Sequence, residues 1–264
     1  MIEGWWVFPV LGLVAGVLAG LLGIGGGLVL IGALVWLLPS YGIPQDAAMH
    51  AALATSLASI VLTATSSARA HARRGSVLWP TVAWMVPGLL LGGWLGSYLA
   101  VELRGDVLRW CVAVYCFVVA AQMALGGPRG DAPKTGVMPT GWPMSAAGTG
   151  IGAVSAIVGI GGGSMTVPLL VWRGVAPVRA VGTSSACGIF IGLSAAAGYA
   201  LHAPPGALPD HAWGYVYLPA AIGIAVASVL AAPLGTRLAH AISGGALRRV
   251  FAVFMVLVGI SVLL

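Results

Sequence analysis

Charged side chains are scarce in this chain. They account for 7% of its 264 residues, whereas apolar residues account for 59%. A soluble domain carries about 25% charged residues, which it needs to cover its surface in water. The scarcity therefore excludes a soluble globular protein and indicates an all-α polytopic membrane protein embedded in a lipid bilayer.

Acidic residues are especially few, with six Asp and Glu against twelve Lys and Arg. None of the six lies in the middle of an apolar run, which argues against a buried proton relay or an acidic cation site. The basic residues lie in short connections, where they act as topology signals. The net charge of +6 therefore does not indicate a nucleic-acid partner.

Cysteine is also rare. Cys111, Cys116 and Cys187 all lie within apolar runs, which excludes a disulfide framework and a metal site built on close cysteine pairs. The chain has no HExxH motif, no paired intramembrane aspartates and no Ser-His arrangement with a suitable spacing. We therefore expect no metal, no cofactor and no enzymatic activity.

Long apolar runs make up most of the chain, and a membrane span needs about 20 apolar residues. The least apolar stretch, GPRGDAPKTGVMPTG at 127–141, contains three prolines and four glycines and is predicted to be a linker. It separates a first transmembrane repeat at 1–126 from a second at 142–264.

The two halves repeat each other. LLGIGGGLVLIGALVW at 21–36 returns as IVGIGGGSMTVPLLVW at 157–172, shifted by 136 positions. Ala-Thr-Ser at 54–56 likewise matches Gly-Thr-Ser at 182–184. Each half is predicted to contain one segment that glycines break, followed by three ordinary transmembrane helices.

Two topologies are compatible with this repeat. If each broken segment crosses fully, the chain has eight spans and parallel halves, and Lys and Arg divide five to seven between the two sides. If each segment returns as a hairpin, the halves are inverted. The division then becomes ten to two, which the positive-inside rule favours. We expect inverted repeats with both chain ends outside, and the eight-span alternative stays open.

The glycine break itself predicts a binding site. Glycine accepts a positive φ, and a broken helix in a membrane is tolerated only beside protein or a watery cavity. A helix that restarts after the break presents free N–H groups and the positive end of its dipole, which suit an anion. The residues assigned to this site are Gly25, Gly26, Gly27, Gly161, Gly162, Gly163 and Ser164.

Other glycines have a simpler interpretation. Two sets of three glycines have a spacing of four residues, which is typical of close helix packing, as in GxxxG seams. Three consecutive glycines instead occupy three faces of a helix, so one packing seam does not account for them. The packing glycines are Gly12, Gly16, Gly20, Gly88, Gly92 and Gly96.

Hydroxyl pairs follow each break at matched positions: Thr55 with Ser56, and Thr183 with Ser184. Hydroxyl donors fit an oxyanion without adding a charge that would trap it, although Ser and Thr in membrane helices also bond their own backbone. We assign all four to the substrate site. Further candidates are His50, Cys187, Arg69 and Arg179, although topology anchoring is the more ordinary role for the two arginines.

The motifs together resemble the sulfite exporter TauE/SafE family of bacterial permeases. The resemblance is carried by the duplicated GIGGG, by ALATS at 52–56 and AVGTS at 180–184, and by HARRG at 71–75. It covers nearly the whole chain. It implies a multi-pass protein of the bacterial inner membrane that transports sulfite, organic sulfonates or similar small anions, usually outward.

Several functions remain open on the sequence alone. The main one is a transporter that alternates access around a midplane anion site. An anion channel of the same architecture, an uptake permease for another small anion and a non-transporting accessory subunit are the alternatives. The sequence is equally compatible with a monomer and with a homodimer.

Overall fold

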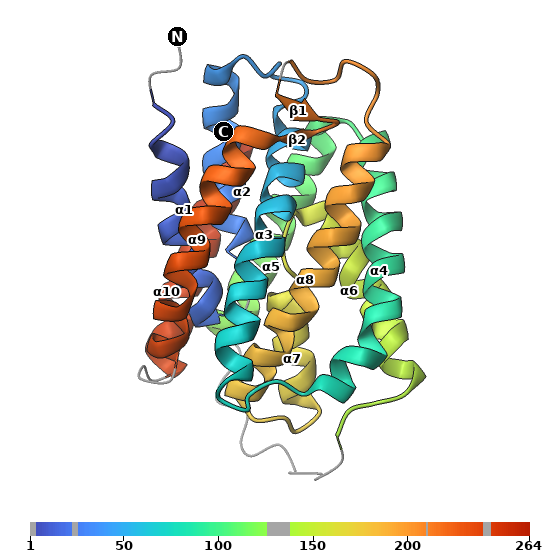
Figure 1. Cartoon of the computed structure of the whole chain (residues 1–264), viewed down its shortest axis with the longest axis vertical. Coiled ribbons are helices and arrows are strands. Elements are labelled where there is room, and N and C mark those ends of the chain that lie inside the picture. The colour runs from blue at the N-terminus through green and yellow to red at the C-terminus, as the bar shows by residue number, and fades with distance from the viewer. Residues whose placement is uncertain (1–3, 23–25, 126–137, 210, 240–243) are drawn as a thin grey trace.

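A computed structural model describes residues 4–22, 26–125, 138–209, 211–239 and 244–264 (Figure 1). Most of the predicted linker and Gly25 lie outside these ranges. The helices and strands are α1 (Val7–Leu22), α2 (Gly27–Leu37), the 3-10 helix η1 (Leu38–Tyr41), α3 (Ala48–Ala72), α4 (Trp79–Glu102), α5 (Gly105–Leu125), α6 (Trp142–Val158), α7 (Gly163–Trp172), α8 (Pro177–Leu201), β1 (Ala212–Trp213), β2 (Val216–Tyr217), α9 (Leu218–Ala239) and α10 (Gly244–Leu263).

The described part of the protein is mostly helical, as the composition predicts. Within the described ranges, five helices are long and apolar enough to cross a membrane: α3, α4, α5, α8 and α9. The prediction of an all-α polytopic membrane protein is confirmed at this level. The small antiparallel pair β1–β2, which joins α8 to α9, was not predicted.

Shorter helices occur in two pairs, each separated by a GIGGG motif. The pair α1 and α2 has 16 and 11 residues, and the pair α6 and α7 has 17 and 10. Neither motif continues as one uninterrupted helix, because a new helix begins at Gly27 and at Gly163. The glycine runs therefore interrupt the helices where the sequence predicts a break.

Helix contacts recur between the halves. The helix α1 packs on α9 while α6 packs on α4, and α2 lies on α3 while α7 lies on α8. The two long helices α3 and α8 pack against each other near the centre of the molecule (Figure 1). The contact pattern is thus nearly unchanged when the two halves are exchanged.

The packing glycines lie in the two equivalent seams. A methyl group built on Gly16 would lie 2.5 Å from the Ser228 carbonyl oxygen in α9. One built on Gly92 would lie 2.0 Å from the Thr149 carbonyl oxygen in α6. Gly12, Gly20, Gly88 and Gly96 make similar contacts, which confirms the predicted packing role.

The same contacts give the helix directions. Residues 12, 16 and 20 of α1 meet residues 224, 228 and 232 of α9, so these two helices run parallel. Residues 88, 92 and 96 of α4 meet 145, 149 and 153 of α6, again in parallel. Between α3 and α8, by contrast, Ser67 meets Ser185 whereas Leu57 meets Gly192, so those helices run antiparallel.

Candidate functional site

Two glycines with left-handed backbone mark the breaks. Gly26 precedes α2 with φ 72°, and Gly162 precedes α7 with φ 73°. A residue with a Cβ is strained in this conformation, and neither position has room for one. A methyl group on Gly26 would lie 2.4 Å from the Ala15 carbonyl oxygen, and one on Gly162 would lie 2.5 Å from Ile191 Cδ1. Both positions therefore require glycine.

The two breaks lie against each other. A methyl group built on Gly27 would be 2.5 Å from the carbonyl oxygen of Gly159, which ends α6. Ser56 of α3 joins the same two places, because its hydroxyl shares its proton in a bifurcated hydrogen bond between the Gly27 carbonyl at 3.2 Å and the Gly159 carbonyl at 3.1 Å. The sequence-predicted Ser56, Gly26 and Gly27 therefore come together with the break of the other half.

The second break is lined by hydroxyl groups. Residues 159–164 are all buried, and the Ser164 hydroxyl is hydrogen-bonded to the Tyr115 hydroxyl of α5. The hydroxyls of Ser155 and Thr166 are buried and have no hydrogen-bond partner among the described residues. Unpaired buried hydroxyls are costly, and sites that bind a polar ligand often keep them.

Sequence reasoning did not select Tyr115, Ser155 or Thr166. The positions 136 residues before Ser155 and Thr166 are Ala19 and Leu30, so the repeat gave no signal at either of them. The spacing of Ser155 from Gly159, one helical turn before the break, is the feature that could have pointed to it.

The threonines of the two Thr-Ser pairs have backbone partners away from the breaks. Thr55 Oγ1 accepts from the Tyr217 amide at 3.0 Å, and Thr183 Oγ1 accepts from the Leu78 amide at 3.0 Å. These amides immediately precede α9 and α4, so the threonines fix the starts of equivalent helices. Ser184 is fully buried beside Thr183 in α8.

The remaining candidates are dispersed. Cys187 is buried in α8 with its Sγ 3.9 Å from Met85 Sδ, which fits a packing role. Arg179 is exposed near the start of α8. Arg69 lies at the end of α3 in a groove with other arginines. None of these three takes part in the contacts that join the two breaks.

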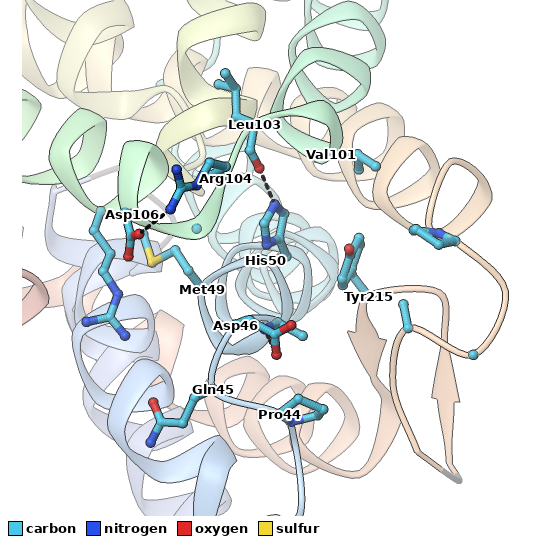
Figure 2. Close-up of a pocket in the computed structure, with 16 residues that line it drawn as sticks. Pro44, Gln45, Asp46, Met49, His50, Val101, Leu103, Arg104, Asp106 and Tyr215 are labelled. Atoms are coloured by element: carbon cyan, nitrogen blue, oxygen red, sulfur yellow. Dashed lines mark hydrogen bonds and ion pairs between the residues drawn. The ribbon is translucent and has the colours of Figure 1, made fainter.

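His50 lies in a separate pocket at the start of α3 (Figure 2). The pocket has a volume of about 630 Å³ and opens between α3, the α4–α5 connection and the segment that follows α8. The His50 Nε2–H donates to the Leu103 carbonyl at 2.9 Å, which fixes the tautomer and leaves Nδ1 able to accept. The ring of Tyr215 stacks on His50 with centroids 4.9 Å apart.

Charges of both signs line this pocket. Arg104 and Asp106 form an exposed ion pair at 3.6 Å, with Asp46 nearby (Figure 2). Arg109 also lines the pocket. Burial, and secondarily the Asp46 carboxylate, raises the pKa of Tyr215, so its hydroxyl stays neutral. Two acidic and two basic side chains thus line the pocket, so it carries no excess of positive charge that would concentrate anions.

The five helices of the described residues that are long and apolar enough to span a membrane fit a multi-pass membrane protein, and paired helix breaks of this kind are common in membrane transporters. The chain belongs to the sulfite exporter TauE/SafE family, whose sequence profile matches residues 8–262. The expected family resemblance is thereby confirmed, and the chain is a multi-pass bacterial membrane protein.

Curated relatives cover nearly the whole chain. A "Probable membrane transporter protein" of Haemophilus influenzae is 33% identical over 254 residues, covering 96% of each chain. A protein of the same description from Xylella fastidiosa (strain Temecula1) is 28% identical, covering 92% of this chain and 89% of its own. A Methanocaldococcus jannaschii relative is 24% identical, covering 97% and 94%. No solved structure matches the chain. The names indicate a transporter and not an enzyme.

Proposed function

We propose that this protein exports a small sulfur-containing anion, such as sulfite or a sulfonate, across the bacterial inner membrane. The anion would bind beside the two helix breaks near the membrane midplane, and access would alternate between the two sides. The observation that carries this proposal is the direct contact between the breaks, with Ser56 bridging the carbonyls of Gly27 and Gly159.

The chemistry of the breaks suits an oxyanion. The first N–H groups of α7 have no partner within the helix, and the helix dipole adds a positive potential there. The Ser155 and Thr166 hydroxyls lack protein partners within the described part of the chain, and Ser164 lies at the helix start. These groups donate hydrogen bonds to anionic oxygens without a fixed charge that would hold the ion permanently.

Inverted halves account for the helix directions. The parallel pairs α1–α9 and α4–α6, with α3 antiparallel to its counterpart α8, support a second half that runs opposite to the first. The Tyr41 hydroxyl donates to the Gly4 carbonyl at 3.0 Å, so the first broken segment begins and ends on one side. This contact supports a hairpin over a full crossing, and each half then crosses three times.

Burial of the breaks supports a carrier over an open channel. Residues 159–164 are buried, as are Gly26 and Gly27, so the site is closed off in this conformation. A channel requires a continuous polar path, whereas a carrier passes through a state in which the site is closed to both sides.

We assign Thr55 and Thr183 to positioning α9 and α4 around the site.

Export is the direction that voltage favours. A monoanion that leaves a negative-inside cell gains about 2.3 kcal/mol per 100 mV, or roughly fortyfold in concentration ratio. None of the described helices carries a carboxylate in the middle of a span, as the sequence predicts, so export driven by voltage alone is the simplest arrangement.

Flux in proteoliposomes tests this function. Purified protein should move sulfite or a small sulfonate down an imposed voltage, because the site binds the anion without a coupling cation. Flux should saturate, and substrate on the opposite face should stimulate it. A non-saturating current would identify a channel, and the absence of flux of any small anion would support the accessory-subunit alternative.

Topology can be tested separately. A reporter placed after Leu264 is expected to lie outside the cell, because inverted halves with three crossings each bring both ends to the same side. A second reporter inserted within 127–141 should lie in the cytoplasm. If both reporters are cytoplasmic, the inverted arrangement and its sidedness are wrong.

A further inference from the structure

A basic groove lies between the C-terminal ends of α3 and α9. Both of these helix ends are at the bottom of the view in Figure 1. Its volume is about 310 Å³. Four arginines line it, from the end of α3, the turn that follows α3 and the end of α9. The lining residues are Ser66, Arg69, Ala70, Arg73, Arg74, Pro233, Thr236 and Arg237.

The groove holds an excess of positive charge. Arg69, Arg73 and Arg237 are exposed and have no carboxylate partner in the described part of the chain. The described acidic residues lie away from the groove: Asp46 precedes the start of α3, Glu102 ends α4 and Asp106 is in the first turn of α5. Arg74 has a structural role as well, since its Nη1 donates to the Thr236 carbonyl at 3.3 Å and ties the turn to α9.

The pairing of the two helices does not depend on Arg69, Arg73 or Arg237. In the other half of the chain, the helices that correspond to α9 and α3 are α4 and α8. Their contact has aromatic side chains at the matching positions. Pro233 and Arg237 correspond, 139 positions earlier, to Trp94 and Tyr98. Both of those rings contact His202 edge-on, at centroid distances of 4.9 and 5.1 Å. The corresponding helices α4 and α8 thus pack together without a basic cluster, so packing alone does not explain Arg69, Arg73 and Arg237.

Exposed leucines continue from the groove toward the membrane core. Leu62 lies one turn above Ser66 on α3 and is 50% exposed. Leu230 and Leu234 lie two turns and one turn above Arg237 on α9 and are 72% and 53% exposed. The surface is thus cationic at the ends of the two helices and apolar one to two turns further along them, which matches the head group and the acyl chains of a phospholipid.

We propose that this α3–α9 groove is a binding site for an anionic phospholipid. The phosphate lies among the guanidinium groups of Arg69, Arg73 and Arg237, which bind phosphate oxygens through paired N–H groups. The acyl chains lie along Leu62, Leu230 and Leu234. Basic pockets between transmembrane helices on the cytoplasmic side are suited to such head groups. A free phosphate or substrate anion shares the head-group chemistry but does not use the leucines.

Native mass spectrometry of the full-length protein in detergent tests the proposal. Dioleoylphosphatidylglycerol should bind more tightly than dioleoylphosphatidylcholine. Each of Arg69→Gln, Arg73→Gln and Arg237→Gln should weaken phosphatidylglycerol binding about fivefold. Arg173→Gln is the matched control, because it removes one exposed charge at the end of α7, outside the groove, and should leave binding unchanged.

The apolar half of the site has its own test. Leu230→Gln should weaken phosphatidylglycerol binding while the midpoint of thermal unfolding without lipid stays unchanged, because this side chain is exposed. Inorganic phosphate at millimolar concentration should not displace the lipid. Equal loss in Arg173→Gln and Arg69→Gln would show non-specific attraction and overturn the proposal. Displacement by phosphate or sulfite, with no effect of Leu230→Gln, would show a soluble-anion site instead.

Discussion

Replacing Gly162 with valine is expected to reduce anion flux by roughly ten- to hundredfold. The residue has φ 73°, and a Cβ there would lie 2.5 Å from Ile191 Cδ1. A left-handed conformation costs a non-glycine residue about 1–3 kcal/mol, which lowers the population of the intact break by a corresponding factor. Gly26→Val should behave in the same way, because Gly26 has φ 72° and a Cβ there would lie 2.4 Å from the Ala15 carbonyl oxygen. The measurement is the initial flux rate in proteoliposomes at equal protein content.

Gly42→Val is the matched control for strain. Gly42 also has positive φ, 86°, but nothing lies within 4 Å of a methyl group built there, and it caps η1 away from the breaks. Gly42→Val should lose stability through the same backbone strain, without a steric clash, and keep its flux. Ser56→Ala tests the same contact without backbone strain and should reduce flux, whereas Ser59→Ala, whose hydroxyl donates to the Thr55 carbonyl of its own helix, should not. Equal flux in Gly162→Val and Gly42→Val would contradict the site assignment.

Replacing Gly92 with leucine is expected to cause the largest loss of stability. A methyl group at this position would lie 2.0 Å from the Thr149 carbonyl oxygen, so α4 and α6 would have to separate. Overpacking of this kind costs about 3 kcal/mol or more. The midpoint of thermal unfolding in detergent should fall by about 10 °C.

Gly150→Leu provides the comparison within the same helix pair. Gly150 belongs to α6, is exposed, and has nothing within 4 Å of a built methyl group. Leucine is also the better helix former, by about 1 kcal/mol. Its midpoint temperature should therefore stay the same or rise. A similar fall in both variants would show that the seam tolerates side chains and that Gly92 is not a packing residue.

The membrane class, the helix breaks and the packing seams were predictable from the sequence. Composition decides the first, since a chain with 7% charged residues does not cover a surface in water. The GIGGG repeat decides the second, because three consecutive glycines do not serve one packing face. The packing seams were predictable from glycines spaced four residues apart. A Cβ on Gly12 or Gly88 would indeed meet the backbone of the partner helix.

The hydrogen-bond partners of the hydroxyl groups were not predictable. Thr55 and Ser56 are adjacent in sequence, yet Thr55 accepts from the Tyr217 amide while Ser56 donates to both breaks. A helix turns about 100° per residue, so neighbours face different elements, and the identity of those elements depends on tertiary packing. Ser155 and Thr166 have no hydroxyl counterpart in the first half of the chain. Their place beside the second break became visible only in the folded protein, because it depends on which groups surround them.

The most direct test of the central claim is an experimental structure of the protein with a bound small sulfonate or sulfite. The account predicts density for the anion beside the starts of α2 and α7, within hydrogen-bonding distance of Ser164 and of the Ser155 or Thr166 hydroxyl. Density found only in the His50 pocket or the α3–α9 groove, with the breaks still packed against each other, would contradict it.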